Sequence, residues 1–374
     1  MALAMYRKYR PQVFEDILGQ AHIVEILKNA ARENKLAQAY LFHGPRGSGK
    51  TTMARLIAKI ANCETRARDP NFRATGEPCN RCRPCIEINA GHALDVIEID
   101  AASNRGIDEI RDLKEGLRLF PTSYPFKVII IDETHQLTKD AFNALLKTLE
   151  EPPAHAILIL ATTEYEKVPA TIISRTQKFH FRKIPLSAMI EKLSTIAKKE
   201  KFSVTAEALE LIAASAEGSL RDAESLLDQL AALTKKVDLA AVERTIGKVG
   251  FRRTATLAEY ILNNNLPAAL EYIELINEEG HNVVDLVREL IHYFRRALTL
   301  NANPNLAELF HEQITDAELT LLKNHSQLID PRKHTVLIRA LIRAYTETRY
   351  SPFASIPLEV ALVECLRPPE ARRD

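Results

Sequence analysis

Five short runs typical of strands, three of them almost wholly apolar, alternate with amphipathic stretches in the first half of the chain. One of them, Val128–Ile131, is an unbroken β-branched run, which is typical of a parallel strand that is buried on both faces. The other four expected strands are Tyr40–His43, Val96–Ile99, Ile157–Ala161 and Lys178–Phe181. Helical stretches separate them, such as Lys139–Glu151, which is stopped by Pro152. This alternation predicts an α/β domain on a parallel five-stranded sheet, with ligands at the carboxyl edge of the strands.

The second half of the chain has a helical pattern throughout. From Pro185 to about Leu366 the apolar residues recur at helical spacing, and Ser219 and Asp222 form a capping box for one of the helices. We therefore expect a small helical domain, followed by an all-helical domain that provides an assembly surface. The expected boundaries are 1–183 for the α/β domain, 184–248 and 249–366 for the two helical domains, and 367–374 for a disordered tail.

Composition and charge are those of an ordinary globular protein. Of the 374 residues 46% are apolar, and no apolar run approaches the roughly 18 residues that a membrane span requires. The start of the chain lacks the apolar core of a secretory signal, so we expect a cytoplasmic protein. The formal net charge is only +1, so a nucleic-acid partner must be bound by a local basic patch.

The chemistry of the chain is centred on the eight residues GPRGSGKT, at positions 44–51. They match the phosphate-binding pattern G-x-x-x-x-G-K-[ST], between an expected strand and an expected helix. The glycines let successive N–H groups turn toward phosphate oxygens, Lys50 adds a positive charge, and the Thr51 hydroxyl is a ligand for Mg²⁺. The pattern predicts that the protein binds a nucleoside triphosphate. The residues expected to bind it are Gly44, Pro45, Arg46, Gly47, Ser48, Gly49, Lys50, Thr51 and Thr52.

Two acidic residues follow the strand Val128–Ile131. Asp132 is placed to hold Mg²⁺, and Glu133 is placed to take a proton from an attacking water molecule. One alternative is a strand that merely ends in acids; another is a helicase box, which Asp-Glu-Thr-His resembles, although the other helicase signatures are missing. Thr163, at the end of the next strand, is placed either to position the attacking water or to act as a capping residue.

Four of the five cysteines lie in one short insertion, residues 63–85. Cys63 and the run Cys79-x-x-Cys82-x-x-Cys85 match a structural four-cysteine zinc site. The run also begins an iron–sulfur pattern, but the x3-C-P that should follow Cys85 is missing. The same four cysteines could instead contain a redox pair or stay reduced and free. The fifth cysteine, Cys365, lies in an apolar helical pattern and is expected in the core.

Taken together, these stretches resemble the gamma/tau family of bacterial DNA polymerase III clamp-loader subunits, in the AAA+ ATPase superfamily. The resemblance runs from Tyr6 to about Leu366. Besides the phosphate loop and the cysteine insertion, its specific motifs are Tyr9-Arg10-Pro11, Gly19-Gln20, Ile99 to Ser103, Phe142 to Pro153, Ala161 to Thr163, Ser174-Arg175 and Gly218 to Asp222. The chain departs from the family pattern at Thr176, where many members have cysteine, and in a longer gap between Cys63 and Cys79.

The resemblance assigns roles to individual residues. It implies that Arg10 and Leu18 border the adenine, that Thr163 is the sensor-1 residue, and that Arg221 is sensor 2 in the second domain. Arg175 is similar to the arginine finger, which acts on ATP in a neighbouring subunit. The four cysteines resemble the family's zinc module, and the third domain resembles its oligomerisation collar. The residues expected to contact DNA phosphates, unless they are plain solvated charges, are Arg105, Arg111 and Lys147.

The resemblance implies an ATPase that acts as a subunit of DNA-directed DNA polymerase III, with no polymerase active site of its own. The implied cofactors are ATP, Mg²⁺ and Zn²⁺; the implied partners are delta- and delta-prime-type subunits, further gamma/tau copies, the sliding clamp and primed DNA of the bacterial nucleoid. Because the chain ends after the collar, we expect a gamma-like form or a truncated tau, without the domains that bind the helicase and the polymerase core. The alternatives are a scaffold subunit that does not hydrolyse ATP and another DNA-dependent AAA+ motor.

Overall fold

The computed structural model describes residues 3–104, 106–246, 250–310, 314, 316–351 and 353–366. The chain divides into two compact units. The first unit comprises Met1–Ile184 and Glu217–Ser225, and the second comprises Pro185–Ala216 and Leu226–Asp374. Among the described helices, none combines the length and the apolar character that crossing a membrane requires.

The first unit is built on a five-stranded sheet in which every neighbouring pair of strands is parallel. Its strands are β1 (Ala39–His43), β2 (Val96–Asp100), β3 (Lys127–Asp132), β4 (Ala156–Thr162) and β5 (Gln177–His180). Their order is β2-β3-β4-β1-β5, so the strand that precedes the phosphate loop lies between β4 and β5. The predicted parallel sheet is confirmed, and each strand end lies within one residue of the expected position.

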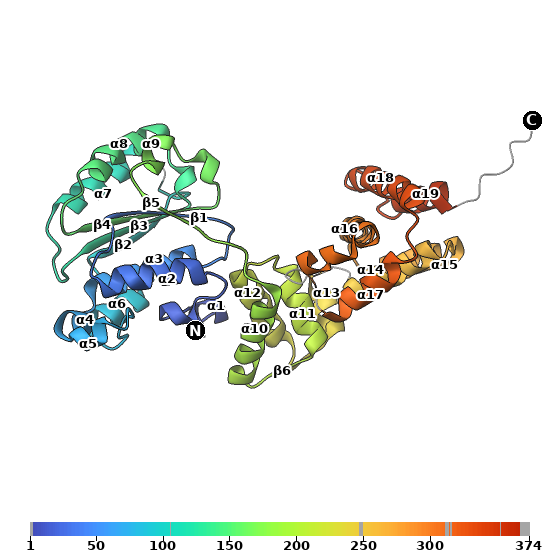
Figure 1. Cartoon of the computed structure of the whole chain (residues 1–374), viewed down its shortest axis with the longest axis horizontal. Coiled ribbons are helices and arrows are strands. Elements are labelled where there is room, and N and C mark those ends of the chain that lie inside the picture. Colours follow the sequence, from blue (N-terminus) through green and yellow to red (C-terminus); the bar gives the residue numbers. More distant parts are fainter. Residues whose placement is uncertain are drawn as a thin grey trace, which may run out of the picture. The chain divides into compact units, whose positions relative to one another are not determined.

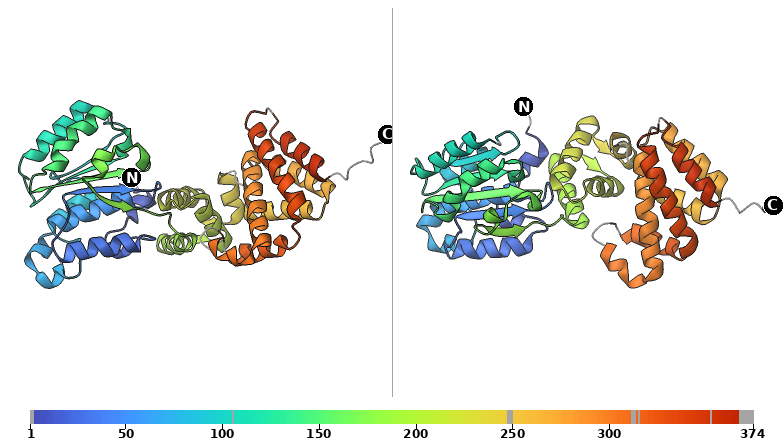
Figure 2. Two further views of the ribbon diagram at one scale, coloured as in Figure 1. Left: turned by 45° about the horizontal axis from the view of Figure 1, so that its top comes forward. Right: turned by 90° about the horizontal axis from the view of Figure 1, so that it is seen from above.

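Helices cover both faces of this sheet (Figures 1 and 2). The covering helices are α2 (Ala21–Arg32) and α3 (Lys50–Asn62) on one face, and α7 (Ile107–Arg118), α8 (Lys139–Glu150) and α9 (Ala170–Ile173) on the other. Successive residues of a strand pack into opposite layers: Tyr40 lies in the core with α2 and α3, and Leu41 in the core with α7 and α8. The apolar runs of β3 and β4 are unbroken because both faces of these two strands are buried.

Several elements of the first unit escape prediction from the sequence pattern. They are α1 (Met5–Lys8), η1 (Phe14–Asp16), α4 (Glu64–Arg68), α5 (Pro70–Arg73), α6 (Arg83–Ala90), η2 (Thr134–Gln136), η3 (Tyr165–Lys167) and the longer α2. Elements of three to eight residues are too short for a helical period to be recognised. In α2 the signal is present, because Ile23, Leu27 and Ala31 recur every four residues and are all buried.

The second unit begins with a small helical group. Its helices are α10 (Leu186–Glu200), α11 (Ala206–Ser215), α12 (Leu220–Leu233), whose first residues belong to the first unit, and α13 (Leu239–Ile246). One half of the predicted capping box is present, because Ser219 Oγ accepts the backbone N–H of Asp222 at 3.3 Å. The expectation of helices only is wrong here: β6 (Ser203–Val204) and β7 (Lys236–Val237) form a parallel pair. Strands of two residues are too short to show an alternating pattern.

The remaining helices of the second unit share one apolar core. They are α14 (Phe251–Leu262), α15 (Leu266–Glu278), α16 (Val283–Ala302), η4 (Pro304–Phe310), α17 (Asp316–Ser326), α18 (Pro331–Thr348) and α19 (Ile356–Leu366). The longest of them, α16, packs against α14, α17 and α18 and buries Tyr293 and Phe294. Cys365 is partly buried against this core. The expected disordered tail, residues 367–374, lies outside the described residues.

Candidate nucleotide-binding site

The phosphate-binding loop joins the end of β1 to the start of α3, at the carboxyl edge of the sheet. A side chain on Gly44, whose φ is 143°, would place its Cβ 2.3 Å from the carbonyl oxygen of Phe181. A side chain on Gly47, whose φ is 70°, would place its Cβ 2.0 Å from Ser219 Oγ. Glycine is therefore required at both positions, by backbone conformation and by the space between the loop and its neighbours.

Lys50 is buried within the loop. Its Nζ donates hydrogen bonds to the carbonyl oxygens of Gly44 and Pro45, both at 2.9 Å. Burial lowers the pKa of Lys50, whereas the nearby Glu133 and Asp132 carboxylates act to raise it. The loop therefore holds a cation at the point where an anionic phosphate would bind, and acidic side chains lie close by.

Asp132, at the end of β3, reaches the start of α3. Its Oδ2 accepts a hydrogen bond from Thr51 Oγ1 at 2.7 Å, and its Oδ1 accepts the backbone N–H of Glu133 at 2.9 Å. A hydroxyl and a carboxylate are hard oxygen ligands of the kind that Mg²⁺ prefers. The two expected Mg²⁺ ligands are therefore direct neighbours, and their chemistry fits the ion.

Glu133 lies beside Thr163, the residue that follows β4. Thr163 Oγ1 donates a hydrogen bond of 2.9 Å to Glu133 Oε2. A third group, His135, approaches the same oxygen: its Nδ1 lies 3.5 Å from Glu133 Oε2 and 3.0 Å from Thr162 Oγ1. His135 was not predicted as a site residue, because its burial, with 5% of the side chain exposed, becomes visible only in the structure.

A cleft in the first unit is lined by the loop, the two acids and two further segments. The loop and the acids contribute Arg46, Gly47, Ser48, Gly49, Lys50, Thr51, Thr52, Asp132 and Glu133. An N-terminal arm (residues 6–18) contributes Tyr6, Arg10, Pro11, Ile17 and Leu18. The start of α12 contributes Leu220, Arg221 and Glu224. The structure thus brings the predicted Arg10, Leu18 and Arg221 to the same cleft as the phosphate loop. The predicted Gly44 and Pro45 are not among the lining residues, but their carbonyl groups accept hydrogen bonds from Lys50.

An aromatic ring of the arm lies beside Arg221. The guanidinium carbon of Arg221 is 5.0 Å from the centroid of the Tyr6 ring, which is within the range of a cation–π interaction. Tyr6 was not predicted, because an aromatic residue in a basic stretch gives no indication of a partner more than 200 positions away. Arg10, in the same arm, is partly buried, and this burial lowers its pKa.

Arg175 occupies the turn between α9 and β5. Its Nε and Nη2 donate to Glu150 Oε1, at the end of α8, at 2.9 and 2.5 Å. Its Nη1 donates to the carbonyl oxygen of Thr171 at 2.8 Å. Within the described part of the chain, the arginine is therefore paired with a carboxylate and is not among the residues that line the cleft.

Of the three residues expected to contact DNA, the structure describes two. Arg111, on α7, is exposed, and its Nη1 lies 3.3 Å from Asp108 Oδ1. Lys147, on α8, is also exposed, and α8 packs against α7. Arg105 lies outside the described residues. The two described cations are thus on adjacent helices that cover the same face of the sheet.

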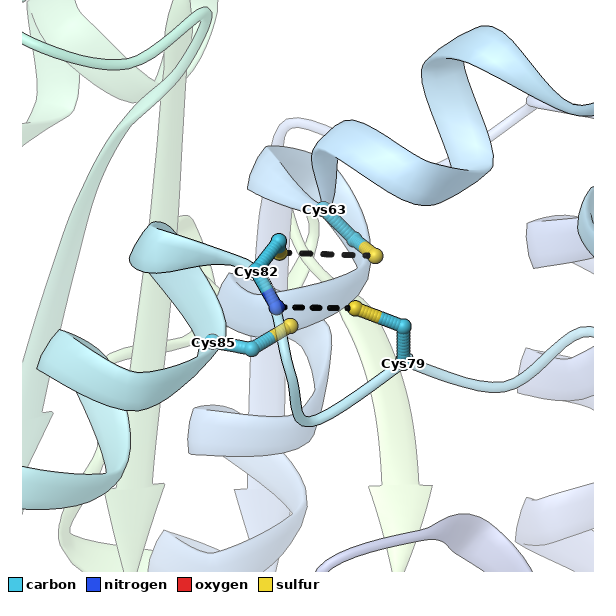
Figure 3. A group of neighbouring side chains, drawn as sticks. All are labelled: Cys63, Cys79, Cys82 and Cys85. Carbon is cyan, nitrogen blue, oxygen red and sulfur yellow. Dashed lines mark hydrogen bonds between the residues drawn. The ribbon is translucent and has the colours of Figure 1, made fainter.

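The four cysteines of the insertion come together at one point (Figure 3). Their sulfur atoms lie within 4.8 Å of one another, and Cys82 Sγ is 3.9 Å from Cys63 Sγ. In a tetrahedral zinc site with Zn–S distances near 2.3 Å the sulfur atoms are about 3.8 Å apart, so the cluster is close to the size of such a site. The backbone N–H of Cys82 donates to Cys79 Sγ at 3.2 Å, which stabilises negative charge on that sulfur.

Two cysteines of the cluster differ in how easily they ionise. Hydrogen bonding with Cys85 lowers the pKa of Cys63, and the same interaction raises the pKa of Cys85. The thiolate is the form of cysteine that binds a metal. Four sulfur ligands make a closed site, whereas a catalytic zinc keeps one position open. The cluster is therefore compatible with a structural zinc ion.

Three family models match the chain in succession. They are described as "DNA polymerase III, delta subunit" over residues 19–185, "DNA polymerase III clamp loader subunit, ATPase lid domain" over residues 189–236, and "DNA polymerase III subunits gamma and tau domain III" over residues 237–372. The chain is also 33% identical to DNA polymerase III subunit gamma of Buchnera aphidicola subsp. Schizaphis graminum over 363 residues, which cover 96% of this chain and 97% of that one. The chain belongs to the gamma/tau family of DNA polymerase III subunits.

Two longer relatives in this family are tau subunits. Identity is 42% over 364 residues with that of Bacillus subtilis, covering 96% of this chain and 62% of the relative. The chain is 36% identical to the tau subunit of Escherichia coli over 361 residues, which cover 96% of this chain and 54% of the relative. The chain therefore spans between one half and two thirds of the length of these tau relatives. The predicted family is confirmed, as is the predicted succession of an α/β sheet domain, a lid and a helical gamma/tau domain.

Proposed function

We propose that this chain is an ATP-hydrolysing subunit of the clamp loader of bacterial DNA polymerase III. It binds ATP, opens the sliding clamp and loads the clamp onto primed DNA, so that the polymerase replicates DNA processively. The observation that carries this proposal is the contact between Thr51 of the phosphate loop and Asp132, at 2.7 Å, with Glu133 directly beside them. A loop that binds phosphate thus lies next to the acids that hydrolysis requires.

In this proposal the cleft binds ATP along its length. Arg10 and Leu18 of the arm border the adenine, while Lys50 and the backbone N–H groups of the loop bind the phosphates. Thr51 and Asp132 would hold Mg²⁺, which supplies positive charge to the terminal phosphates. Family membership supports this arrangement, because the matched model over residues 189–236 is an ATPase lid domain.

Hydrolysis then depends on groups around the terminal phosphate. Glu133 accepts the proton of the attacking water as general base, and Thr163, hydrogen-bonded to Glu133 at 2.9 Å, acts as the sensor of the γ-phosphate. Arg221 brings charge from the start of α12, as sensor 2. Arg175 acts in trans on the ATP of a neighbouring subunit. The chain is an ATPase within the polymerase holoenzyme and has no polymerase site of its own.

The remaining surfaces serve assembly and DNA binding. The helical domain after α13 joins this chain to further gamma/tau copies and to delta- and delta-prime-type subunits, as a collar. Arg105, Arg111 and Lys147 contact DNA phosphates, since a loader must accept any sequence. The cysteine cluster holds a structural zinc ion. The complex works in the cytoplasm, at the replicating DNA.

An ATPase assay tests this proposal. The chain, assembled with its delta- and delta-prime-type partners, is assayed alone, with the sliding clamp, and with the clamp and primed DNA. The rate of hydrolysis should be highest when the clamp and primed DNA are both present. Lys50→Ala should abolish hydrolysis, because the negative charge of the phosphates would then lack its positive partner. ATP binding without hydrolysis would indicate a scaffold subunit. A rate of hydrolysis that DNA increases but the clamp does not change would indicate another DNA-dependent motor.

A further inference from the structure

The arm that lines the cleft is held from behind by the cysteine insertion. Arg10 and Pro11 line the cleft, and so do Ile17 and Leu18. The residues between these two pairs, 12–16, contact the insertion and the end of α3 instead. The position of the lining residues therefore depends on how their connecting segment is fixed.

The first contact is made by Lys59, near the end of the helix that follows the phosphate loop. Only 1% of Lys59 is exposed. Its Nζ donates to Gln12 O at 2.8 Å, to Gln12 Oε1 at 3.2 Å and to Asn80 Oδ1 at 2.7 Å. Asn80 Nδ2 donates to the same Gln12 carbonyl at 3.1 Å. One carbonyl group of the arm is thus held by α3 and by the insertion together.

The second contact lies two residues further along the arm. Glu77 Oε2 accepts the backbone N–H of Phe14 at 2.8 Å, and the Phe14 side chain is fully buried. Lys28 of α2 completes the contact, because its Nζ lies 3.0 Å from Glu77 Oε1 and 2.6 Å from Glu15 Oε1. The insertion therefore binds the backbone of the arm at two positions, through side chains that belong to neither the phosphate loop nor the cysteine cluster.

We propose that Lys59, Glu77 and Asn80 are positioning residues for nucleotide binding: they fix residues 12–14 of the arm and thereby place Arg10 and Leu18 against the base. This inference rests on the proposed binding of ATP. A loose arm would have to be ordered by the nucleotide, and the entropy cost would weaken binding. The role of the cysteine insertion is then to give the arm a rigid support.

The position of Asn80 adds a link to the metal site. Asn80 lies between Cys79 and Cys82, so a metal ion that orders these cysteines also orders the side chain that holds Gln12. Coupling between two binding equilibria is reciprocal. ATP should therefore slow the loss of zinc to a chelator, and the Asn80 contact should carry part of this protection.

Asn80→Gly is the sharpest test. Asn80 has a left-handed backbone, with φ of 55°, so glycine removes its side-chain contacts without straining the chain. Asn34→Gly is the matched control, because Asn34 has φ of 56° in the same unit and an exposed side chain. Glu77→Ala is the second variant and removes the contact with Phe14 N–H. Binding of N-methylanthraniloyl-ATP is measured for each, together with zinc content, and inorganic tripolyphosphate serves as a competitor that lacks a base.

Both Asn80→Gly and Glu77→Ala should raise the Kd for the ATP analogue by about 5- to 20-fold, in the lower part of the range for coupled sites. Asn34→Gly should leave it unchanged. The affinity for tripolyphosphate should stay the same in all variants, because tripolyphosphate binds the loop and not the arm. The zinc content should remain at about one ion per chain in all variants. ATP should slow the release of zinc to a chelator less in Asn80→Gly than in the unaltered chain.

Two results would overturn the inference. One is an unchanged Kd for the ATP analogue in both variants, or a higher Kd only in chains that have lost zinc, because the side-chain contacts would then be dispensable. The other is an equal loss of affinity for the analogue and for tripolyphosphate, because the effect would then not pass through the arm. If the unaltered chain binds neither compound, the proposed function itself fails.

Discussion

Thr163 donates its hydroxyl to Glu133, with 2.9 Å between Thr163 Oγ1 and Glu133 Oε2. The two residues come from neighbouring strands, because β3 ends at Asp132 and β4 ends at Thr162. The hydrogen bond fixes the orientation of the carboxylate beside the phosphate loop. It also connects the proposed base directly to the proposed sensor.

The first prediction concerns Glu133. Glu133→Gln keeps the shape of the side chain and still accepts the Thr163 hydrogen bond, but it cannot take a proton from water. We expect ATP binding to be retained and turnover to fall by about 10²–10⁴-fold, the usual contribution of a general base. Equilibrium binding of an ATP analogue and steady-state hydrolysis measure the two effects. Lys50→Ala is the comparison, since it should lose binding; normal hydrolysis by Glu133→Gln would mean that another residue is the base.

The second prediction concerns the metal. Metal analysis of the purified chain should find about one zinc per chain, held by Cys63, Cys79, Cys82 and Cys85. Cys85→Ser should lose the ion and lower the melting temperature of the first unit, because Cys85 is buried. Cys365→Ser is the control outside the cluster. It should leave the zinc content unchanged and should lower the melting temperature less than Cys85→Ser does. A metal-free chain with the same fold and stability would refute the zinc assignment.

The fold of the first unit was predictable because its signals are local and strong. The run Val128–Ile131 is apolar at every position, and in the structure both faces of β3 are buried. The spacing of the glycines identifies the phosphate loop, so the roles of Lys50 and Thr51 could be assigned from the motif alone. The cysteine cluster was predictable for the same reason, since Cys63 and the run from Cys79 to Cys85 match the spacing of a structural four-cysteine site.

The parts that could not be predicted depend on tertiary contacts. Lys59 lies on an amphipathic helix, and nothing in its sequence neighbourhood indicates that its Nζ binds Gln12, 47 positions earlier. Glu150 belongs to a charged helix end, yet it pairs with Arg175 across 25 positions. A sequence pattern reports whether a residue faces a core or solvent. It does not report which distant backbone carbonyl or carboxylate completes a buried hydrogen-bond set.

The third prediction concerns DNA. Neutralising Arg105, Arg111 and Lys147 together should weaken DNA-stimulated hydrolysis equally for all sequences, because phosphates and not base edges are contacted. Each lost phosphate contact should reduce the slope of log affinity against log salt by about 0.9 on duplex DNA. Arg68→Ala, an exposed arginine on the cysteine insertion, is the control and should leave the slope unchanged. Unchanged stimulation in the triple variant would place the DNA path elsewhere.

The fourth prediction concerns acid stability of the second unit. His325 and His334 are both buried, and burial lowers the pKa of each. His325 Nδ1 lies 2.6 Å from the Tyr293 hydroxyl, a contact within the apolar core. In the unfolded chain these histidines bind a proton near pH 6.5. Because the unfolded state then binds more protons than the folded state, the free energy of unfolding decreases as pH falls below about 6.5.

This decrease can be measured by urea unfolding, followed through helical circular dichroism, at pH 8 and pH 5.5. A double variant, His325→Gln with His334→Gln, should lose less stability between these two pH values than the unaltered chain. The difference should be at most about 1.4 kcal/mol for each histidine, because pH 5.5 lies only about one unit below the pKa of histidine in the unfolded chain. His92→Gln, which changes an exposed histidine of the first unit, is the control. An equal loss of stability in all chains would contradict the prediction.

The last prediction concerns Arg175 and tests whether its functional partner is Glu150 or the ATP of a neighbouring subunit. Within the chain, Arg175 is paired with Glu150; in the proposed assembly it acts on the ATP of the neighbouring subunit. Arg175→Ala should leave the subunit's own ATP binding unchanged and slow hydrolysis at the neighbour's site by about 10³–10⁵-fold, as for other arginine fingers. Glu150→Gln is the matched control, because it weakens the same ion pair but keeps the arginine. If both variants were equally slow, the ion pair and not the finger would be what hydrolysis needs.

Mixed assemblies decide whether Arg175 acts in trans. Lys50→Ala chains keep Arg175 but lose their own ATP site, and Arg175→Ala chains keep the ATP site but lose the arginine. When the two are mixed, an interface that pairs the intact loop of one chain with the intact arginine of the other should hydrolyse ATP, because the transition-state charge is stabilised only across docked subunits. Activity should therefore reappear in the mixture although each variant alone is inactive. A mixture that assembles, binds DNA and still has no activity would show that Arg175 acts within its own subunit.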